Sequence, residues 1–229
     1  MIDVYRKELK YYLHREEMNT LKQRLSYIMC SDGHNGPEGY RVRSLYFDTV
    51  SDGDYQDKMD GLEERRKIRL RIYDAKSDTI KLELKEKTDQ SQRKRSLSLN
   101  RWEAEEMIAG RYAFLLDRPE ALAGWLYAYM NIRCYRPKCV VEYDRYAFGM
   151  DTNDIRVTFD HHLRAGESSF AFFDSELPLY PVMGQEAITM EVKYNGFLFS
   201  LIKQELNLAD RMVCSRSKYC SARMITKKG

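Results

Sequence analysis

Hydrophobic and polar residues alternate in several short stretches of the chain, which indicates β-strands with one apolar and one polar face. In RKIRLRIY (66–73), both isoleucines and the leucine fall on one side of such a strand, whereas Lys67, Arg69 and Arg71 fall on the other. The same alternation, or a run of branched and aromatic residues, predicts further strands at residues 3–13, 40–49, 79–87, 93–99, 138–149, 154–160 and 188–195.

Apolar residues at helical spacing indicate helices between and after these strands. Residues 16–29 carry apolar side chains with a helical period, which predicts an amphipathic helix. Asn100 followed by Glu103 resembles a capping box that opens a helix over 102–110, and Pro119 is placed to open the next helix. We expect another helix after the last strand.

Together these elements predict one α+β domain over residues 1–229. The chain has 43% hydrophobic residues, enough for a substantial core. The strands at 66–73 and 79–87 lie on either side of a short segment that contains AKSD, which is typical of an antiparallel hairpin. Because no repeat, low-complexity tract or linker interrupts the pattern, we expect a single unit built mainly of antiparallel strands.

Charge and cysteine usage narrow the class of protein. The net charge is only +3, so no overall basic excess points to nucleic acid, and we expect no nucleic-acid partner. The start, MIDVYRKELK, has charges where a signal peptide needs an apolar run, and no stretch approaches the roughly 20 apolar residues of a membrane span. Five cysteines without a CxxC pair fit reduced thiols. We therefore expect a cytoplasmic protein, which a separate membrane partner could hold at the inner membrane face.

The polar faces of the predicted strands share an excess of arginine and lysine. If helices cover the apolar faces, these charged faces point either into water or into the interior of a closed barrel. For one strand alone, a solvated lysine-rich edge is the simpler explanation. Two cations ~7 Å apart repel by about 0.6 kcal/mol in water and about 2.4 kcal/mol at an effective dielectric constant of 20, so a barrel lined in this way needs a bound polyanion. Arginine forks, as in 66–73, bind phosphate oxygens in pairs.

These stretches resemble the VTC domain of polyphosphate polymerases, a branch of the triphosphate tunnel metalloenzymes. The matching pieces cover nearly the whole chain and are, in order, RKELKYYL, SLYFDT, KIRLRIY, KLELKEK, RKRSL, YDRYAF, IRVTFD, MEVKY and SKYCSARM. The resemblance implies an antiparallel β-barrel tunnel, like that of the triphosphate tunnel metalloenzymes, with flanking helices. It also implies ATP or another triphosphate as substrate, inorganic polyphosphate as product, and a divalent metal, Mn²⁺ or Mg²⁺, as cofactor.

The resemblance further implies a set of site residues. The residues expected to act on the transferring phosphates are Lys10, Arg69, Arg71, Lys85, Arg145 and Arg156. The residues expected to bind substrate elsewhere in the tunnel are Lys87, Lys94, Lys193, Ser217 and Lys218. Glu191 is expected to be the metal ligand, with Glu8 and Glu83 as additional or outer ligands, because hard divalent cations prefer carboxylate oxygen. Each of these glutamates is otherwise equally well explained as a salt-bridge partner of lysine or arginine.

Two departures from the hydrolase branch favour synthesis of polyphosphate over hydrolysis. That branch carries Glu-x-Glu-x-Lys on its first strand, and Arg6 stands here in place of the first acid. On the late strand, Lys193 follows Glu191 at the position where a second acid would help to hold metal. We therefore expect transfer of the γ-phosphate of ATP to a growing polyphosphate chain with release of ADP. In that reaction the acceptor phosphate is the nucleophile, and the protein supplies positioning and charge.

Two other functions remain open on the sequence. A metal-dependent tri- or polyphosphatase would use the same residues with water as acceptor, and a noncatalytic subunit would bind polyphosphate without turnover. The chain contains no GxxxxGK[ST], GxGxxG, HExxH or GxSxG motif, so P-loop, dinucleotide, zinc-protease and hydrolase-elbow functions have no support. His161 and His162 follow the strand at 154–160, and we interpret them as turn residues rather than a metal pair.

Overall fold

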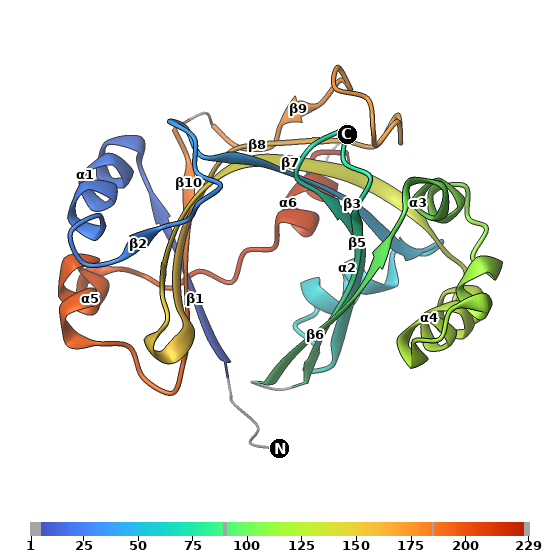
Figure 1. The fold of residues 1–229 in the computed structure, drawn as a ribbon, viewed down its shortest axis with the longest axis horizontal. Coiled ribbons are helices and arrows are strands. Elements are labelled where there is room, and N and C mark those ends of the chain that lie inside the picture. Colours follow the sequence, from blue (N-terminus) through green and yellow to red (C-terminus); the bar gives the residue numbers. More distant parts are fainter. Residues whose placement is uncertain (1–5, 89–90, 185, 227–229) are drawn as a thin grey trace. The chain divides into compact units, whose positions relative to one another are not determined.

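A computed structural model describes residues 6–88, 91–184 and 186–226 of the protein. Its strands form a ten-stranded sheet in the order β1-β10-β8-β7-β3-β4-β5-β6, with β2 beside β7 and β9 beside β8 (Figure 1). The strands run antiparallel in the pairs β1–β10, β10–β8, β2–β7, β3–β4, β4–β5 and β5–β6. The residues group into two compact units, each assembled from separate stretches of the chain, and β3, β7, β8 and the two-residue β9 contribute to both. The predicted α+β class with an antiparallel sheet and flanking helices is confirmed.

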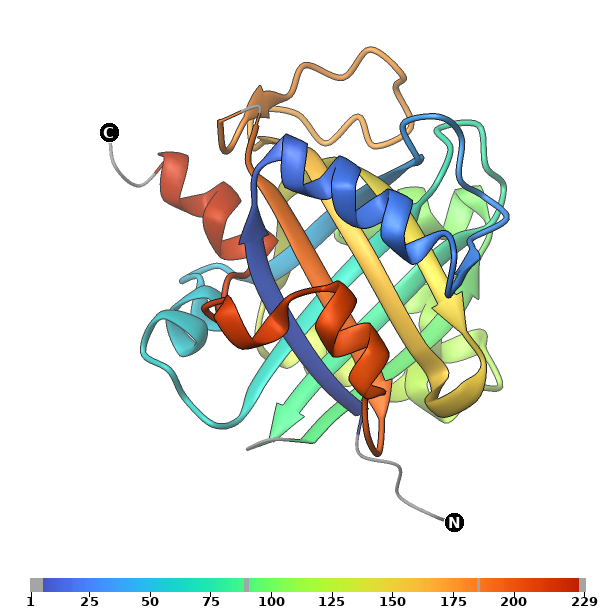
Figure 2. The same cartoon turned by 90° about the vertical axis from the view of Figure 1, so that its left-hand side faces the viewer.

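Unit 1 comprises residues 1–41, 143–164 and 181–217. Its elements are β1 (Arg6–Leu13), α1 (Arg15–Leu25), β2 (Cys30–Ser31), the second part of β7 (Tyr135–Met150), most of β8 (Ile155–Gly166), β10 (Ile188–Asn195), α5 (Ser200–Glu205) and short 3-10 turns at Thr152–Asp154 and Leu208–Asp210. The apolar faces of β1, β8 and β10 pack against α1 and α5, which lie on the same side of these strands (Figure 2). Met18 and Leu25 of α1 and Phe159 of β8 are fully or almost fully buried in this core. The opposite face of the three strands is therefore free to carry charge.

Unit 2 comprises residues 42–142, 165–180 and 218–229. Its elements are most of β3 (Tyr40–Thr49), α2 (Gly53–Met59), β4 (Arg65–Ile72), β5 (Ile80–Thr88), β6 (Ser91–Leu99), α3 (Arg101–Ile108), a 3-10 turn (Ala113–Asp117), α4 (Ala121–Ile132), the first part of β7, β9 (Tyr180–Pro181) and α6 (Lys218–Thr226). The isoleucines and leucines of β4 and β5 pack against α3 and α4 in one core. This packing follows the alternation in the sequence, because the apolar half of each strand faces the helices.

The capping box at the start of α3 is confirmed. The backbone N–H of Glu103 donates to Asn100 Oδ1 at 2.9 Å, and the backbone N–H of Asn100 donates to Glu103 Oε2 at 2.8 Å. These two bonds satisfy backbone donors that the first turn of a helix leaves without partners. The next helix, α4, begins at Ala121 with Glu120 as its N-cap, so Pro119 precedes this helix rather than opening it.

Several element boundaries differ from those expected. The helix predicted to reach residue 29 ends at Leu25, and the next residues form turns. Residues 3–5 of the first predicted strand lie outside the described residues. The interpretation of His161 and His162 as turn residues is wrong, because β8 runs through both of them to Gly166. The strand is expected to end before these two adjacent polar residues. His161 is 1% exposed and hydrogen-bonded within the fold, so a polar side chain at this position is compatible with a continuing strand.

No helix within the described ranges is both long and apolar enough to cross a bilayer.

Candidate functional site

Unit 1 carries a row of charged residues on the face of β1, β10 and β8 opposite its helices. Glu8 of β1 lies directly across from Lys193 of β10, and Lys193 lies across from Arg156 of β8. In the next row, Lys10 lies across from Glu191. Since residues directly opposite each other in an antiparallel pair point to the same side, these side chains share one face. The predicted residues of the three strands are thus brought together by register alone.

Glu191 lies at the centre of these contacts, in a group that we call the Glu191 cluster and that comprises Glu8, Lys10, Arg145, Asp160, Glu191 and Lys193. Lys10 Nζ lies 3.3 Å from Glu191 Oε1 and 3.1 Å from Glu8 Oε1. Lys193 Nζ lies 2.9 Å from Glu191 Oε2 and 3.6 Å from Glu8 Oε2. The Glu191 side chain is only 6% exposed, so its charge is held largely out of water by the lysines that contact it.

Arg145 enters the Glu191 cluster from β7. Its Nε and Nη2 lie 2.6 and 2.8 Å from the two carboxylate oxygens of Asp160, and Nη2 lies 3.8 Å from Glu191 Oε2. Burial acts to lower the pKa of Arg145, but Asp160 raises it well above its usual value, so the guanidinium stays charged. A two-pronged carboxylate contact of this kind fixes the plane of the guanidinium group.

Arg156 shares the face of the Glu191 cluster but is held by different residues. Its Nη2 donates to Asp32 Oδ2 at 2.6 Å and to the Tyr40 hydroxyl at 3.0 Å. Asp32 follows β2, so the loop after that strand orients this arginine. The Arg156 side chain is 37% exposed, which leaves it accessible to an anion from solvent.

Unit 2 carries a cationic face on β4, β5 and β6. Arg69 of β4 lies between Tyr46 of β3 and Glu83 of β5 in one row, and Arg71 lies between Ser44 and Lys81 in the next. Two further rows pair Lys67 with Lys85 and Lys94, and Arg65 with Lys87 and Gln92. In these strands as described, Glu83 is the one acidic residue on this face, so the face has a large excess of positive charge.

Glu83 is surrounded by cations in a group that we call the Glu83 cluster, comprising Tyr46, Arg69, Arg71, Glu83 and Lys94. Arg69 Nε donates to Glu83 Oε2 at 2.7 Å, Arg71 Nη1 lies 3.7 Å from the same oxygen, and Lys94 pairs with Oε1. Burial acts to raise the pKa of Glu83, but Arg69 and Arg71 lower it well below its usual range. Arg69 also donates to the Tyr46 hydroxyl at 2.8 Å.

Arg71 has an unsatisfied donor in this cluster. Both arginines are 8% exposed, and the Arg71 Nε is buried without a hydrogen-bond partner among the described residues. One carboxylate thus faces three cations, and one guanidinium N–H remains unused. Buried donors are normally paired, so this N–H is an exception in the cluster.

Helix α6 packs beside the Glu83 cluster. The Tyr219 ring stacks on the Tyr46 ring with 5.1 Å between centroids, and the Tyr219 hydroxyl donates to Asp48 Oδ2 at 2.6 Å. Lys218, the first residue of α6, immediately precedes this anchored tyrosine. Ser217 is the last residue of unit 1 and is 9% exposed.

The structure brings together most of the predicted residues, but in two groups. Lys10, Arg145 and Lys193 with Glu8 and Glu191 lie in unit 1, and Arg69, Arg71 and Lys94 with Glu83 lie in unit 2. Asp160, Asp32 and Tyr46 orient arginines but are not among the predicted site residues. Two of them have a signal in the sequence, because alternation places Asp160 on the side of Arg156 and Tyr46 on the side of Ser44. Asp32 lies in a loop, where no periodicity indicates its direction.

The carboxylate oxygens of Glu8 and Glu191 are suitable ligands for a divalent cation. Glu8 and Glu191 share Lys10 and Lys193, so two carboxylates lie in one small group, and hard divalent cations prefer such oxygen ligands. Glu83 lies in unit 2 and contacts Arg69, Arg71 and Lys94. Its surroundings favour a role in orienting cations over a role as metal ligand.

Comparisons with known proteins relate the whole chain to one family. The family model described as VTC domain matches residues 5–227. Among solved structures, a Bacillus halodurans protein provisionally named an adenylate cyclase aligns with a TM-score of 0.54 at 13% identity, covering 93% of this chain and 95% of that one. A conserved hypothetical protein from Pyrococcus furiosus aligns with a TM-score of 0.50 at 9% identity, covering 95% and 99%. At such low identity these two structures show a common fold. A search of the curated proteins found no match.

Proposed function

Because the chain belongs to the VTC domain family, in the triphosphate tunnel superfamily, we propose that it is an ATP-dependent polyphosphate polymerase. In this reaction a terminal oxygen of the polyphosphate chain attacks the γ-phosphorus of ATP. The bond between the γ-phosphorus and the β,γ-bridging oxygen breaks, ADP leaves, and the chain grows by one phosphate. No side-chain nucleophile is required, because the acceptor supplies the attacking oxygen.

The observation that carries the proposal is the excess of positive charge on the face of β4, β5 and β6, where Arg71 Nε also has no hydrogen-bond partner among the described residues. In the proposed reaction, Arg69 and Arg71 bind phosphate oxygens, with Lys85, Lys87 and Lys94 extending the same face. Glu83 is a positioning residue, since it holds Arg69 through a 2.7 Å hydrogen bond and shares its charge among three cations. Fixed cations of this kind stabilise the charge that develops on the transferring oxygens.

In unit 1 we assign phosphate binding to Lys10, Arg145, Arg156 and Lys193, and metal binding to Glu191 with Glu8. A divalent metal, the usual cofactor of the superfamily, supplies Lewis-acid polarisation of phosphate oxygens when bound. Lys10 and Lys193 already neutralise these carboxylates, so they hold the glutamates in place and contribute positive charge toward the phosphates. Ser217 and Lys218 are assigned to substrate binding from the family resemblance.

One observation favours the alternative of a metal-dependent tri- or polyphosphatase. Glu8 of β1 and Glu191 of β10 lie in adjacent rows of the paired strands and share two lysines, so a two-carboxylate site is available although Arg6 replaces the first acid of the hydrolase motif. The two reactions differ only in their acceptor, which is a polyphosphate oxygen in one and water in the other.

Incubation of the full chain with ATP and Mn²⁺ tests the proposal, with ADP, free phosphate and long polyphosphate followed together. ADP with a ladder of polymer is the expected result, and Glu191→Ala is expected to abolish it while largely sparing triphosphate binding. Glu16→Ala, which changes an exposed glutamate of α1, is the matched control. Free phosphate without polymer would establish the phosphatase instead. Triphosphate binding without turnover would leave a noncatalytic binding subunit.

A further inference from the structure

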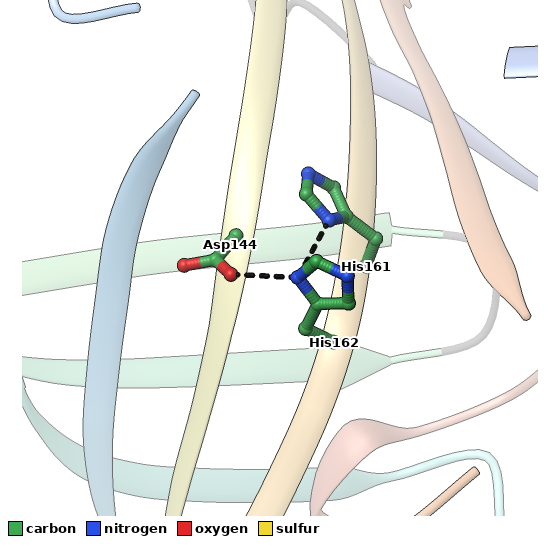
Figure 3. A group of neighbouring side chains, drawn as sticks. All are labelled: Asp144, His161 and His162. Carbon is green, nitrogen blue, oxygen red and sulfur yellow. Dashed lines mark hydrogen bonds and ion pairs between the residues drawn. The ribbon is translucent and has the colours of Figure 1, made fainter. Parts of the chain in front are cut away.

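Unit 1 holds a second group of metal-ligating side chains, formed by Asp144 of β7 with His161 and His162 of β8 (Figure 3). His162 Nδ1 lies 2.9 Å from Asp144 Oδ2 and 3.2 Å from His161 Nδ1. One ligand atom from each residue lies within 4.8 Å of the other two. Ligand atoms about 2 Å from one tetrahedral ion lie about 3.3 Å apart, so small side-chain movements would bring all three onto one ion.

An irregular backbone conformation brings the two histidines together. Strand alternation places His161 on the side opposite Asp160, and Asp144 on the side opposite Arg145. Regular alternation would return His162 to the side of Asp160, but His162 has φ of 50°. This left-handed conformation is uncommon for residues other than glycine, and it leaves the His162 ring beside the His161 ring, with ring centroids 4.5 Å apart (Figure 3).

The hydrogen-bond partners fix the protons of both rings. Arg15 Nη1 lies 2.9 Å from His162 Nε2, and since a guanidinium only donates, Nε2 accepts and the ring proton is on Nδ1, donated to Asp144. His161 Nε2 lies 3.1 Å from the backbone carbonyl of Glu38, which only accepts, so Nε2 carries that ring's proton. His161 Nδ1 therefore presents a lone pair toward His162 and Asp144.

One side of this group is buried and holds a ligand in place, and the other side is open to an ion from solvent. His161 is 1% exposed, and its bond to the Glu38 carbonyl is the outer hydrogen bond that metal-bound imidazoles typically make. The side chains of His162 and Asp144 are 33% and 21% exposed, so an ion can reach them from solvent.

We propose that Asp144, His161 and His162 bind a first-row transition-metal ion of the Zn²⁺ type, at a site separate from the Glu191 cluster. Two imidazole nitrogens and one carboxylate oxygen suit Zn²⁺, whereas Mg²⁺ and Mn²⁺ prefer all-oxygen ligands. Three protein ligands leave one tetrahedral position for water. The ion would link β7 to β8. Arg145 follows Asp144 in the sequence, and Asp160 precedes His161, so the ion would lie behind this arginine and aspartate. It would thereby hold in place an arginine to which we assign phosphate binding.

Arg15 competes with the ion in this arrangement. Coordination through His162 Nδ1 requires the ring proton to move to Nε2, where it would face the Arg15 guanidinium. Arg15 must then give up this contact and keep only its 2.9 Å pair with Glu38. Arg15→Gln, which removes a cation near the site, is therefore expected to tighten Zn²⁺ binding, a result that a purely structural hydrogen-bond network would not produce.

The test is titration of the metal-stripped full chain with Zn²⁺ in competition with a chromogenic chelator. The expected result is one tightly bound Zn²⁺ per chain. His162→Ala and Asp144→Asn are each expected to weaken binding by more than about 100-fold, beyond the 10- to 100-fold that loss of an outer partner costs. His34→Ala, which changes an exposed histidine of the same unit, is the matched control and should bind as the parent does. Circular dichroism of the metal-free variants establishes that they fold.

Glu191→Ala separates this site from the proposed polymerase site. It is expected to bind Zn²⁺ with unchanged affinity even though it loses turnover. Zn²⁺ binding that disappears in Glu191→Ala but persists in His162→Ala would place the ion in the Glu191 cluster and overturn the proposal. Absence of stoichiometric Zn²⁺ binding by the parent chain would overturn it as well, whatever the outcome of the activity assay.

Discussion

Arg71 offers a direct test of anion binding at the scale of a single residue, because it lies on the face of β4, β5 and β6 that has an excess of positive charge. Its Nε lies without a partner among the described residues, while Nη1 reaches Glu83 at 3.7 Å. Charge-assisted hydrogen bonds contribute about 1.5–3 kcal/mol, so Arg71→Ala should weaken binding of tripolyphosphate by about tenfold or more. Isothermal titration calorimetry at low and high salt measures the effect.

Arg93→Ala is the matched control for that substitution. Arg93 is exposed and lies on the opposite face of β6 from Lys94, so it should contribute only a weak, salt-sensitive attraction. Equal losses of affinity in the two variants would mean that the face carrying Arg71 attracts anions only through its overall charge.

A second prediction at this scale concerns Asp54, a buried carboxyl in the first turn of α2. Burial and the nearby charge of Asp48 raise the pKa of Asp54 from 3.8 to about 7. Between these values the folded chain binds more protons at this group than the unfolded chain, so its contribution to stability is full below pH 3.8 and is lost as pH rises toward 7. The free energy of unfolding should fall by about 1 kcal/mol per pH unit through this window from this group alone.

Urea unfolding of the parent chain and Asp54→Asn, measured across the same pH range, tests this. The amide cannot titrate and keeps an acceptor for the Tyr135 hydroxyl, which donates to Asp54 Oδ1 at 2.7 Å. The stability difference between the two proteins should therefore shift in favour of Asp54→Asn as pH rises. A difference that does not change with pH would show that Asp54 titrates normally.

Among the elements, the loop between β2 and β3 has an unusual influence on the site. Gly39 adopts φ of 95°, and a Cβ on it would lie 2.2 Å from the backbone oxygen of Arg145. Gly39→Ala should force this loop away from β7, lowering the thermal stability and weakening phosphate binding through displaced Asp32, which holds Arg156. Differential scanning calorimetry and triphosphate titration measure both effects.

Gly33→Ala in the same loop is the control, because no atom lies within 4 Å of the added methyl group and its backbone is not left-handed. If both alanine variants behave alike, the close approach of Gly39 to β7 does not constrain the site.

At the scale of helices and strands, the sequence predicts which residues share a strand face better than it predicts where each element begins and ends. Alternation in 66–73 and 79–87 places Arg69, Arg71 and Glu83 on one face because strand period is a local property. Which cation contacts which acid depends on register between strands, and residues such as Asp160 act only through that register. The polar pattern predicts that the strand ends at Asp160, whereas β8 continues through the buried His161 and the left-handed His162 to Gly166.

For the whole molecule, the crowding of like charges on the face of β4, β5 and β6 implies a cost in folding free energy that a bound anion relieves. Ligand at about 100 times its dissociation constant stabilises a folded protein by about 2.7 kcal/mol. For a chain of this size that corresponds to a rise of about 5–10 °C in melting temperature. Tripolyphosphate should therefore raise the melting temperature, more at low salt, and Arg71→Ala should respond less. An unchanged melting temperature at saturating tripolyphosphate would argue against phosphate binding by this face.

The pairing of β1 with β10 has a further consequence for how the protein forms during synthesis. Lys10 meets Glu191 only after the chain has been made through the late strand, and at 5–20 residues per second that takes on the order of 10–40 s after β1 has emerged. The β4–β5–β6 hairpins involve only local partners and can close much earlier. The cationic face of unit 2 should therefore form on a ribosome-bound chain before the Glu191 cluster exists, so the two charged groups are completed at different times during synthesis.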